Sequence, residues 1–258
     1  MYTPFDLSGR TAVVTGGNGG IGMGMAKALL AAGAQVAIWG NRAEKTAQAR
    51  DQLAAETGGK VHAFVCDVGD EDAVERTFAE SVQALGGRVD ACFANAGVSS
   101  KGPTPIVQMT AEEFRRVMRI NVEGVFYTFR AAARHMIDHG QGGSLVATAS
   151  TAAIEGAARN SHYGASKGAV TSYCRALAVE LARHQIRVNS ILPGWIVSEM
   201  TQRSMADERF SSNVMPRIPA RRWGTMDDFG GIAVYLASDA AGYTTGEQFV
   251  IDGGYTKF

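Results

Sequence analysis

The stretch TAVVTGGNGGIGMGMAKALL, residues 11–30, places a glycine-rich turn between an apolar run and an amphipathic segment. The turn has the pattern Gly16-x-x-x-Gly20-x-Gly22. Glycine adopts positive φ in a tight turn without steric cost, and it lets a ligand approach backbone that a Cβ would cover. A helix N-terminus also offers N–H groups and a positive dipole end to phosphates. Because the turn follows the first apolar run and opens a helix, the stretch predicts a strand–turn–helix unit that binds phosphate.

Apolar runs and amphipathic segments alternate along the whole chain. The runs that we expect to be strands cover residues 11–16, 35–40, 61–67, 89–95, 144–150, 186–192 and 248–252. The segments that we expect to be helices lie near residues 21–32, 43–57, 70–85, 111–138, 161–184 and 226–238. The runs lack in–out alternation, as expected for parallel strands with helices on both faces. We therefore predict one α/β domain over residues 1–258, a Rossmann-type doubly wound parallel sheet of about seven strands.

One region interrupts this alternation. Residues 193–222 are rich in proline and methionine and contain no predicted element. A long connection in a compact domain is usually functional or mobile, and this one follows a strand end, where ligands bind open α/β sheets. We expect a substrate lid at about residues 195–222, although packing or subunit contacts explain its apolar residues equally well. Its candidate apolar cover is Trp195, Met200, Met205 and Phe210.

The composition narrows the class of protein. The chain has 258 residues, with 25 Lys and Arg against 25 Asp and Glu, so it has no basic excess for a nucleic-acid or anionic-membrane partner. Cys66, Cys92 and Cys174 are too few and too scattered for a disulfide framework or a metal site. No secretory pattern opens the chain, and no apolar run approaches the ~18 residues that cross a bilayer. We expect a cytoplasmic protein without a metal.

A second motif suggests acid–base chemistry. NSHYGASKGAV, residues 160–170, holds Tyr163 and Lys167 at i and i+4, which share one face of a helix. A nearby cation stabilises a phenolate and lowers the pKa of the tyrosine, so the pair is a candidate general acid/base. On the spacing alone, a chance pair of surface residues is the commoner explanation. We expect no direct role for His162, because adjacent helix residues face different directions.

Further motifs surround this pair. Ser150 ends an apolar run 13 residues before Tyr163, and Asn121 lies in RINVEGVF. NAG at 95–97, LPGWIVS at 192–198 and CDVGDED at 66–72 each follow a predicted strand. Together with TGxxxGxG in the glycine turn, these motifs resemble the classical short-chain dehydrogenase/reductase family, near its 3-oxoacyl-reductase-like and glucose-dehydrogenase-like branches. The resemblance extends from about Leu7 to Gly254, and no catalytic position is substituted.

The resemblance implies hydride transfer between a nicotinamide cofactor, NADP(H) or NAD(H), and a carbonyl or alcohol carbon. It implies that Tyr163 exchanges the proton with the substrate oxygen and that Ser150 donates a hydrogen bond to that oxygen. Lys167 is expected to bind the nicotinamide ribose, and Asn121 to position a water that links Lys167 to solvent. The residues expected at the cofactor are Gly16, Asn18, Gly20, Ile21, Gly22, Asn41, Arg42, Asp67, Val68, Asn95, Ala96, Gly97, Tyr163, Lys167, Pro193, Gly194, Ile196 and Ser198.

The stretch QVAIWGNRAEK, residues 35–45, bears on the choice between the two cofactors. Gly40 stands where NAD-preferring members of the family carry an aspartate. Arg42 is placed to pair with a 2′-phosphate, although a solvated arginine fits the position too. Asn41 fits a ribose hydroxyl, and Gly19 stands where many NADP users carry a cation. The stretch favours NADP(H) by a small margin.

The substrate stays open between a 3-oxoacyl thioester, a sugar or polyol, and an apolar cyclic or aromatic ketone or alcohol. The lid residues favour an apolar ketone or alcohol or the thioester, with a sugar or polyol dehydrogenase as the alternative. A second alternative is a dinucleotide-sensing regulator without turnover. The four intact catalytic residues argue against it, because a regulator does not need them. Helical segments 111–138 and 161–184 resemble the family's subunit interface, so a homotetramer is expected, with a dimer next.

Overall fold

The computed structural model describes residues 3–257; Met1, Tyr2 and Phe258, which the predicted domain includes, lie outside the described residues. All seven predicted strands are present and form one parallel sheet in the order β3-β2-β1-β4-β5-β6-β7. The strands are β1 (Thr11–Thr15), β2 (Gln35–Gly40), β3 (Val61–Val65), β4 (Ala91–Ala94), β5 (Gly143–Thr148), β6 (Ile186–Pro193) and β7 (Gln248–Ile251). The chain first winds outward from β1 to β3 and then returns to β4 beside β1. This reversal confirms the predicted doubly wound α/β fold and opens a crevice beyond the ends of β1 and β4.

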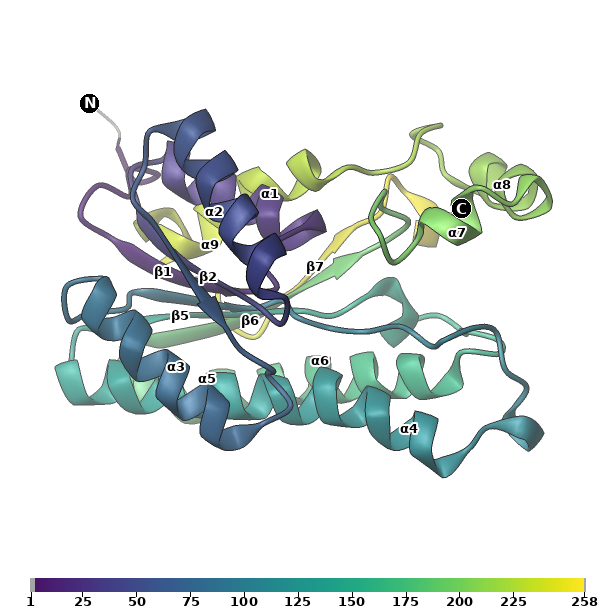
Figure 1. Cartoon of the computed structure of the whole chain (residues 1–258), viewed down its shortest axis with the longest axis horizontal. Helices are drawn as coiled ribbons and strands as arrows, with labels where there is room; N and C mark the ends of the chain where they lie inside the picture. The colour runs from purple at the N-terminus through teal and green to yellow at the C-terminus, as the bar shows by residue number, and fades with distance from the viewer. Residues whose placement is uncertain (1–2, 258) are drawn as a thin grey trace.

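Helices cover both faces of the sheet (Figure 1). The α-helices are α1 (Gly20–Ala31), α2 (Ala43–Thr57), α3 (Glu71–Ala84), α4 (Ala111–Met118), α5 (Gly124–His139), α6 (Ser161–Leu181), α7 (Gln202–Met205), α8 (Glu208–Val214) and α9 (Gly230–Ala237). One layer holds α1, α2 and α9, and the other holds α3, α5 and α6 (Figure 1). Ile38 and Trp39 of β2 enter cores on opposite faces, as successive strand residues must. This double burial explains the continuous apolar runs of the sequence.

The predicted helix over residues 111–138 is broken. It consists of α4, a π-helical segment at Arg119–Glu123, and then α5. A π-turn widens the helix by one residue, and such turns occur often at functional sites. Here the widened turn carries Asn121, which is fully buried.

The segment after β6 forms a small unit of its own at one end of the sheet (Figure 1). It includes α7 and α8, and its Val214 and Ile218 form a small buried cluster with Tyr255 from the C-terminal end of the chain. None of the helices within residues 3–257 combines the length and the apolar character that a membrane crossing requires.

Candidate active site

A cleft of about 610 Å³ lies at the carboxyl ends of the central strands. It is lined by residues that follow five of them: the glycine turn after β1, residues 40–42 after β2, 66–68 after β3, 95–98 after β4 and 148–150 at β5. Tyr163 and Lys167 of α6 also line it. Further lining residues come from the end of β6 and the segment after it: Pro193, Gly194, Ile196 and 198–201. Among the predicted site residues, all but Gly22 and Asn121 line this cleft. The sequence motifs therefore converge on one place, and these two residues lie behind its wall.

The glycine turn forms a cradle at the N-terminus of α1. Gly16 and Gly20 have φ of +64° and +52°, the left-handed region that favours glycine. No side chain caps α1, so the N–H groups of its first turn remain available to a ligand. A Cβ on Gly22 would overlap both the Gly16 carbonyl oxygen and Nδ2 of Asn95. The turn thus fits a diphosphate, and Gly22 packs the helix against the turn.

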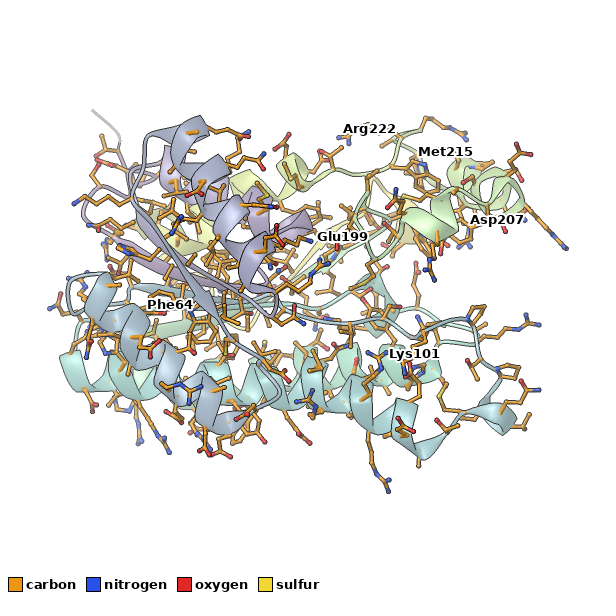
Figure 2. All side chains as sticks on the ribbon, viewed as in Figure 1. Phe64, Lys101, Glu199, Asp207, Met215 and Arg222 are labelled. Atoms are coloured by element: carbon orange, nitrogen blue, oxygen red, sulfur yellow. The ribbon has the colours of Figure 1, made fainter. Side chains whose placement is uncertain are left out.

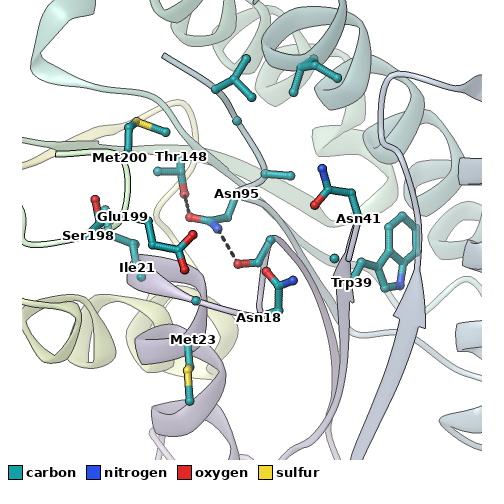
Figure 3. Close-up of a pocket in the computed structure, with 18 of the residues that line it drawn as sticks. Asn18, Ile21, Met23, Trp39, Asn41, Asn95, Thr148, Ser198, Glu199 and Met200 are labelled. Atoms are coloured by element: carbon teal, nitrogen blue, oxygen red, sulfur yellow. Dashed lines mark hydrogen bonds between the residues drawn. The ribbon is translucent and has the colours of Figure 1, made fainter. Parts of the chain in front are cut away.

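Asn95 joins three strand ends beneath the cleft. Its Nδ2 donates to the carbonyl oxygen of Thr15 at 3.1 Å. The Thr148 hydroxyl donates to its Oδ1 at 3.0 Å (Figure 3). The main-chain N–H groups of Asn95 and Ala96 both donate to the Thr15 hydroxyl, at 3.0 and 2.9 Å. The polar atoms of the Asn95 side chain are thus engaged within the protein. Asn95 shapes the cleft floor rather than presenting its amide to a ligand.

Tyr163 and Lys167 face the cleft from α6. The Lys167 ammonium lies 5.7 Å from the centroid of the Tyr163 ring and donates to the Thr148 carbonyl oxygen at 2.8 Å. Burial lowers the pKa of Lys167 to about 8, so the group is mostly protonated at neutral pH. Burial raises the pKa of Tyr163, and hydrogen bonding with Ser150 opposes this shift. The expected lowering of the phenol pKa by Lys167 is not seen; burial is the largest cause of the shift and raises that pKa.

Ser150 faces the cleft, whereas the side chain of Asn121 is hydrogen-bonded within the protein. The Ser150 hydroxyl accepts from the Ala152 N–H at 3.1 Å and lines the cleft. Asn121 accepts from the Val98 N–H at 2.8 Å, and its Nδ2 donates to the Val98 carbonyl and the Ser166 hydroxyl, both at 3.0 Å. These bonds hold the segment after β4 against the widened turn.

Gly97 separates Asn121 from Lys167. A Cβ on Gly97 would lie 3.3 Å from Oδ1 of Asn121 and 3.4 Å from Nζ of Lys167. A side chain at this position would crowd both polar groups. His162, next to Tyr163, points elsewhere, as expected: its Nε2 lies 3.7 Å from Glu113, and it does not line the cleft.

The end of β2, where the expected carboxylate is missing, is closely packed. A Cβ on Gly40 would overlap Nδ2 of Asn18 and Oγ1 of Thr46, which are hydrogen-bonded to each other at 2.9 Å. An aspartate at this position has no room unless both side chains move. Asn41 and Arg42 line the cleft beside this point.

Sequence reasoning missed two charged residues in this corner. Lys45 lines the cleft with Arg42, and Glu199, from the segment after β6, forms ion pairs with both. The i, i+3 spacing of Arg42 and Lys45 at the start of a helix was a usable signal for the lysine. Glu199 had none, because 157 residues separate it from Arg42.

The expected apolar cover of the cleft needs a correction. Met200 lines the cleft, whereas Trp195, Met205 and Phe210 are absent from its lining in the described part of the chain. The Trp195 and Phe210 rings pack edge to face at 4.8 Å, and Trp223 stacks on Phe210. These rings pack against one another within the lid instead of covering the cleft.

Lys167 makes stability depend on pH in a defined window. Its pKa is about 8 in the folded protein against 10.5 for an ordinary lysine, so the unfolded chain binds more protons between these values. The contribution of Lys167 to the free energy of unfolding therefore rises with pH across this window, by on the order of 3 kcal/mol. Urea unfolding at pH 8 and pH 10 measures this effect. The free energy of unfolding of wild type, minus that of Lys167→Met, should be larger at pH 10 than at pH 8. The exposed Lys60, changed to Met, serves as the control, and a constant difference for Lys167→Met would contradict the expectation.

Comparison with known proteins identifies relatives over the whole chain. The family model described as "Enoyl-(Acyl carrier protein) reductase" matches residues 16–256. Gluconate 5-dehydrogenase of Gluconobacter oxydans (strain 621H) is 37% identical over 254 residues, which make up 98% of this chain and 96% of that protein.

Two solved structures are similar throughout. The crystal structure of a short-chain type dehydrogenase/reductase from Mycobacterium marinum has a TM-score of 0.92 and 41% identity, and covers 98% of both chains. That of a putative 2-deoxy-D-gluconate 3-dehydrogenase from Agrobacterium tumefaciens, with bound NADP, has a TM-score of 0.91 and 34% identity, and covers 100% of both.

Proposed function

Because the chain belongs to the classical short-chain dehydrogenase/reductase family, as an NAD(P)-dependent oxidoreductase of CH–OH groups, we propose that it interconverts a secondary alcohol and a ketone on a sugar acid or polyol. One observation carries the chemistry: Ser150, Tyr163 and Lys167 line the same cleft as the glycine cradle. Two of the similar proteins are named for gluconate or a deoxygluconate. The earlier preference for an apolar ketone or a 3-oxoacyl thioester gives way to its alternative, a sugar or polyol dehydrogenase.

Most of the apolar cover on which the other substrate classes depended is absent from the cleft. Met200 is the single residue of that cover among the described lining residues. The lining therefore gives no support to an apolar ketone, and the choice of a sugar acid or polyol rests on the similar proteins.

Tyr163 acts in this proposal as the general acid in reduction and the general base in oxidation. When bound, the nicotinamide supplies or accepts the hydride. The Ser150 hydroxyl donates to the substrate oxygen and stabilises the charge that develops on it. The Lys167 ammonium, held by the Thr148 carbonyl, favours the phenolate and binds ribose hydroxyls. Asn121 is a positioning residue that fixes the segment beside Lys167. In this proposal it would also orient a water on the proton path.

The remaining cleft residues hold the dinucleotide. The turn with Gly16, Asn18, Gly20 and Ile21 binds the pyrophosphate, and the segments around Asp67–Val68 and Asn95–Gly97 border the adenosine. Pro193, Gly194, Ile196 and Ser198 bind the carboxamide.

We infer a small preference for NADP(H), carried by Arg42. Gly40 carries no carboxylate that would repel a 2′-phosphate, and Arg42 offers a charge-assisted pair to it. Arg42→Ala should weaken NADPH binding about tenfold and leave NADH binding unchanged. Fluorescence titration with both cofactors measures this, and Arg50→Ala, an exposed change outside the cleft lining, is the control. Unchanged NADPH affinity in Arg42→Ala would remove the phosphate role.

The substrate assignment is tested by absorbance at the reduced-nicotinamide band. A panel should contain sugar acids of the gluconate type, polyols, apolar cyclic ketones and 3-oxoacyl thioesters, each with both cofactors. We expect the highest kcat/KM with sugar acids or polyols. Turnover confined to the apolar ketones or thioesters would contradict the substrate class. Tight cofactor binding without any turnover would favour the non-catalytic regulator.

We also propose a homotetramer of single-domain subunits in the cytoplasm, each with a lid at about residues 195–222. Phe126 and Ile137 of α5 and Val179 of α6 are exposed apolar side chains on the helices expected at the subunit interface. The three cysteines are free and buried, which suits a reducing compartment. Light scattering on the purified chain tests the assembly, and a monomeric mass would contradict it.

A further inference from the structure

Glu199 connects two parts of the cleft that are far apart in the sequence. Its Oε2 lies 2.8 Å from Nη2 of Arg42, and its Oε1 pairs with the Lys45 ammonium. Arg42 and Lys45 stand where β2 ends and α2 begins, whereas Glu199 follows β6. Figure 2 shows Glu199 between the helices of the N-terminal half and the lid segment that carries Asp207 and Met215. In Figure 3 its side chain extends into the cleft.

The backbone on either side of Glu199 is firmly held. The Ser198 N–H donates to the Thr201 hydroxyl at 3.1 Å, and the Thr201 hydroxyl donates to the carbonyl oxygen of Ile196, which is buried. The Ser198 side chain lies beside Gly20 of the glycine turn. The turn therefore presents Glu199 to the cleft, although the carboxylate itself is largely exposed.

Both cations stand at the corner of the cleft where the adenosine ribose binds in doubly wound folds. In these folds the residue at the end of the second strand contacts the ribose, and a nearby arginine accommodates a 2′-phosphate. Nζ of Lys45 lies 3.0 Å from the position of a Cβ on Gly19, so the ammonium lies against the glycine turn. This corner contains two cations. Because Gly40 carries no acid, the carboxylate that pairs with both cations is that of Glu199, from across the cleft.

We propose that Glu199 is a specificity-determining residue, which competes with the 2′-phosphate of NADP(H) for Arg42 and Lys45 and thereby lowers the preference for NADP(H) over NAD(H). The inference rests on the proposed place of Arg42 at the cofactor. A carboxylate and a phosphate both require the same donors, so NADP(H) has to displace Glu199 to reach them. NAD(H) carries a hydroxyl at that position and leaves the ion pairs intact.

The ion pairs are suited to this competition. Hydrogen bonds from Lys45 and then Arg42 lower the pKa of Glu199, so the carboxylate is charged at neutral pH. Arg42 and Glu199 are 60% and 67% exposed, and exposed ion pairs contribute little free energy because solvent screens them. A dianionic phosphate can therefore displace the carboxylate. This displacement lowers the affinity of the protein for NADP(H) and leaves its affinity for NAD(H) unchanged.

The test compares binding of whole cofactors and of their adenosine fragments. Glu199→Gln keeps the size of the side chain and removes its charge. We expect the Kd of NADPH and of 2′-AMP to fall about threefold to tenfold, and that of NADH and 5′-AMP to stay unchanged. Fluorescence titration suits the cofactors and calorimetry the fragments, so neither readout requires turnover. The control is Glu208→Gln, which removes an equal charge from an exposed lid residue outside the cleft lining.

Several outcomes would overturn the proposal. Unchanged NADPH and 2′-AMP affinity in Glu199→Gln would do so, and so would equal tightening of NADPH and NADH, which indicates a general charge effect. In an Arg42→Ala/Lys45→Ala background, Glu199→Gln should have no effect, and tightening that persists there contradicts competition for these cations. Arg42→Ala alone tests the cofactor preference separately: its failure to weaken NADPH binding removes that preference, whatever Glu199→Gln does.

Discussion

Tyr163→Phe is expected to lower kcat by about 10²–10⁴-fold, the usual contribution of a positioned general acid or base. The change removes the hydroxyl that exchanges the proton with the substrate oxygen and keeps the ring beneath Lys167. The glycine turn and the strand ends that hold the dinucleotide are untouched, so the Kd of the cofactor should stay unchanged. Initial rates at the reduced-nicotinamide band give kcat, and fluorescence titration gives the Kd.

A matched control exists on the same helix. Tyr173 of α6 is half-buried and lies outside the cleft lining, so Tyr173→Phe should retain wild-type kcat. Each variant removes one phenolic hydroxyl group from α6, and the two hydroxyl groups differ in whether they lie at the cleft. A Tyr163→Phe enzyme with near-wild-type turnover would disprove the assignment of the general acid/base.

Gly22→Ala is expected to impair both folding and cofactor binding. Its Cβ would overlap the Gly16 carbonyl and the Asn95 amide, one of which is backbone and unable to move without shifting the turn. Overpacking of this kind costs about 1–3 kcal/mol, which corresponds to roughly 3 to 10 °C in Tm for a chain of this size. Because the displaced turn is the phosphate cradle, the Kd of NADPH and NADH should rise together by about 10- to 100-fold.

Gly231→Ala separates this effect from the loss of a glycine as such. Gly231 lies in α9, and a Cβ there meets nothing within 4 Å. Alanine in a helix interior is more stable than glycine by roughly 0.5–1 kcal/mol, so this control should match or exceed wild type in Tm. Equal cofactor affinity in Gly22→Ala and wild type, by calorimetry, would show that the close packing at Gly22 does not shape the cradle.

Features that leave a local pattern in the sequence were predicted correctly, and features that depend on distant contacts were not. Strand runs and helical segments were predictable because burial on both faces of a parallel sheet leaves a local apolar pattern. The break between α4 and α5 was not predictable, because local propensity does not distinguish a π-turn from a continuous helix. The substrate preference drawn from Trp195 and Phe210 was misplaced for a related reason, since an apolar side chain in a long connection packs equally well on its neighbours or on a ligand.

The sequence by itself determined the α/β fold, the family, and the set of residues that the strand ends bring to one cleft, because each depends on short motifs and their order. The tertiary structure alone decided what surrounds each of them. Packing of Asn18 and Thr46 fills the position of the missing carboxylate at Gly40, and burial lowers the pKa of Lys167. The pairing of Glu199 with Arg42 joins residues 157 apart, and a contact of that separation leaves no local pattern because folding alone creates it.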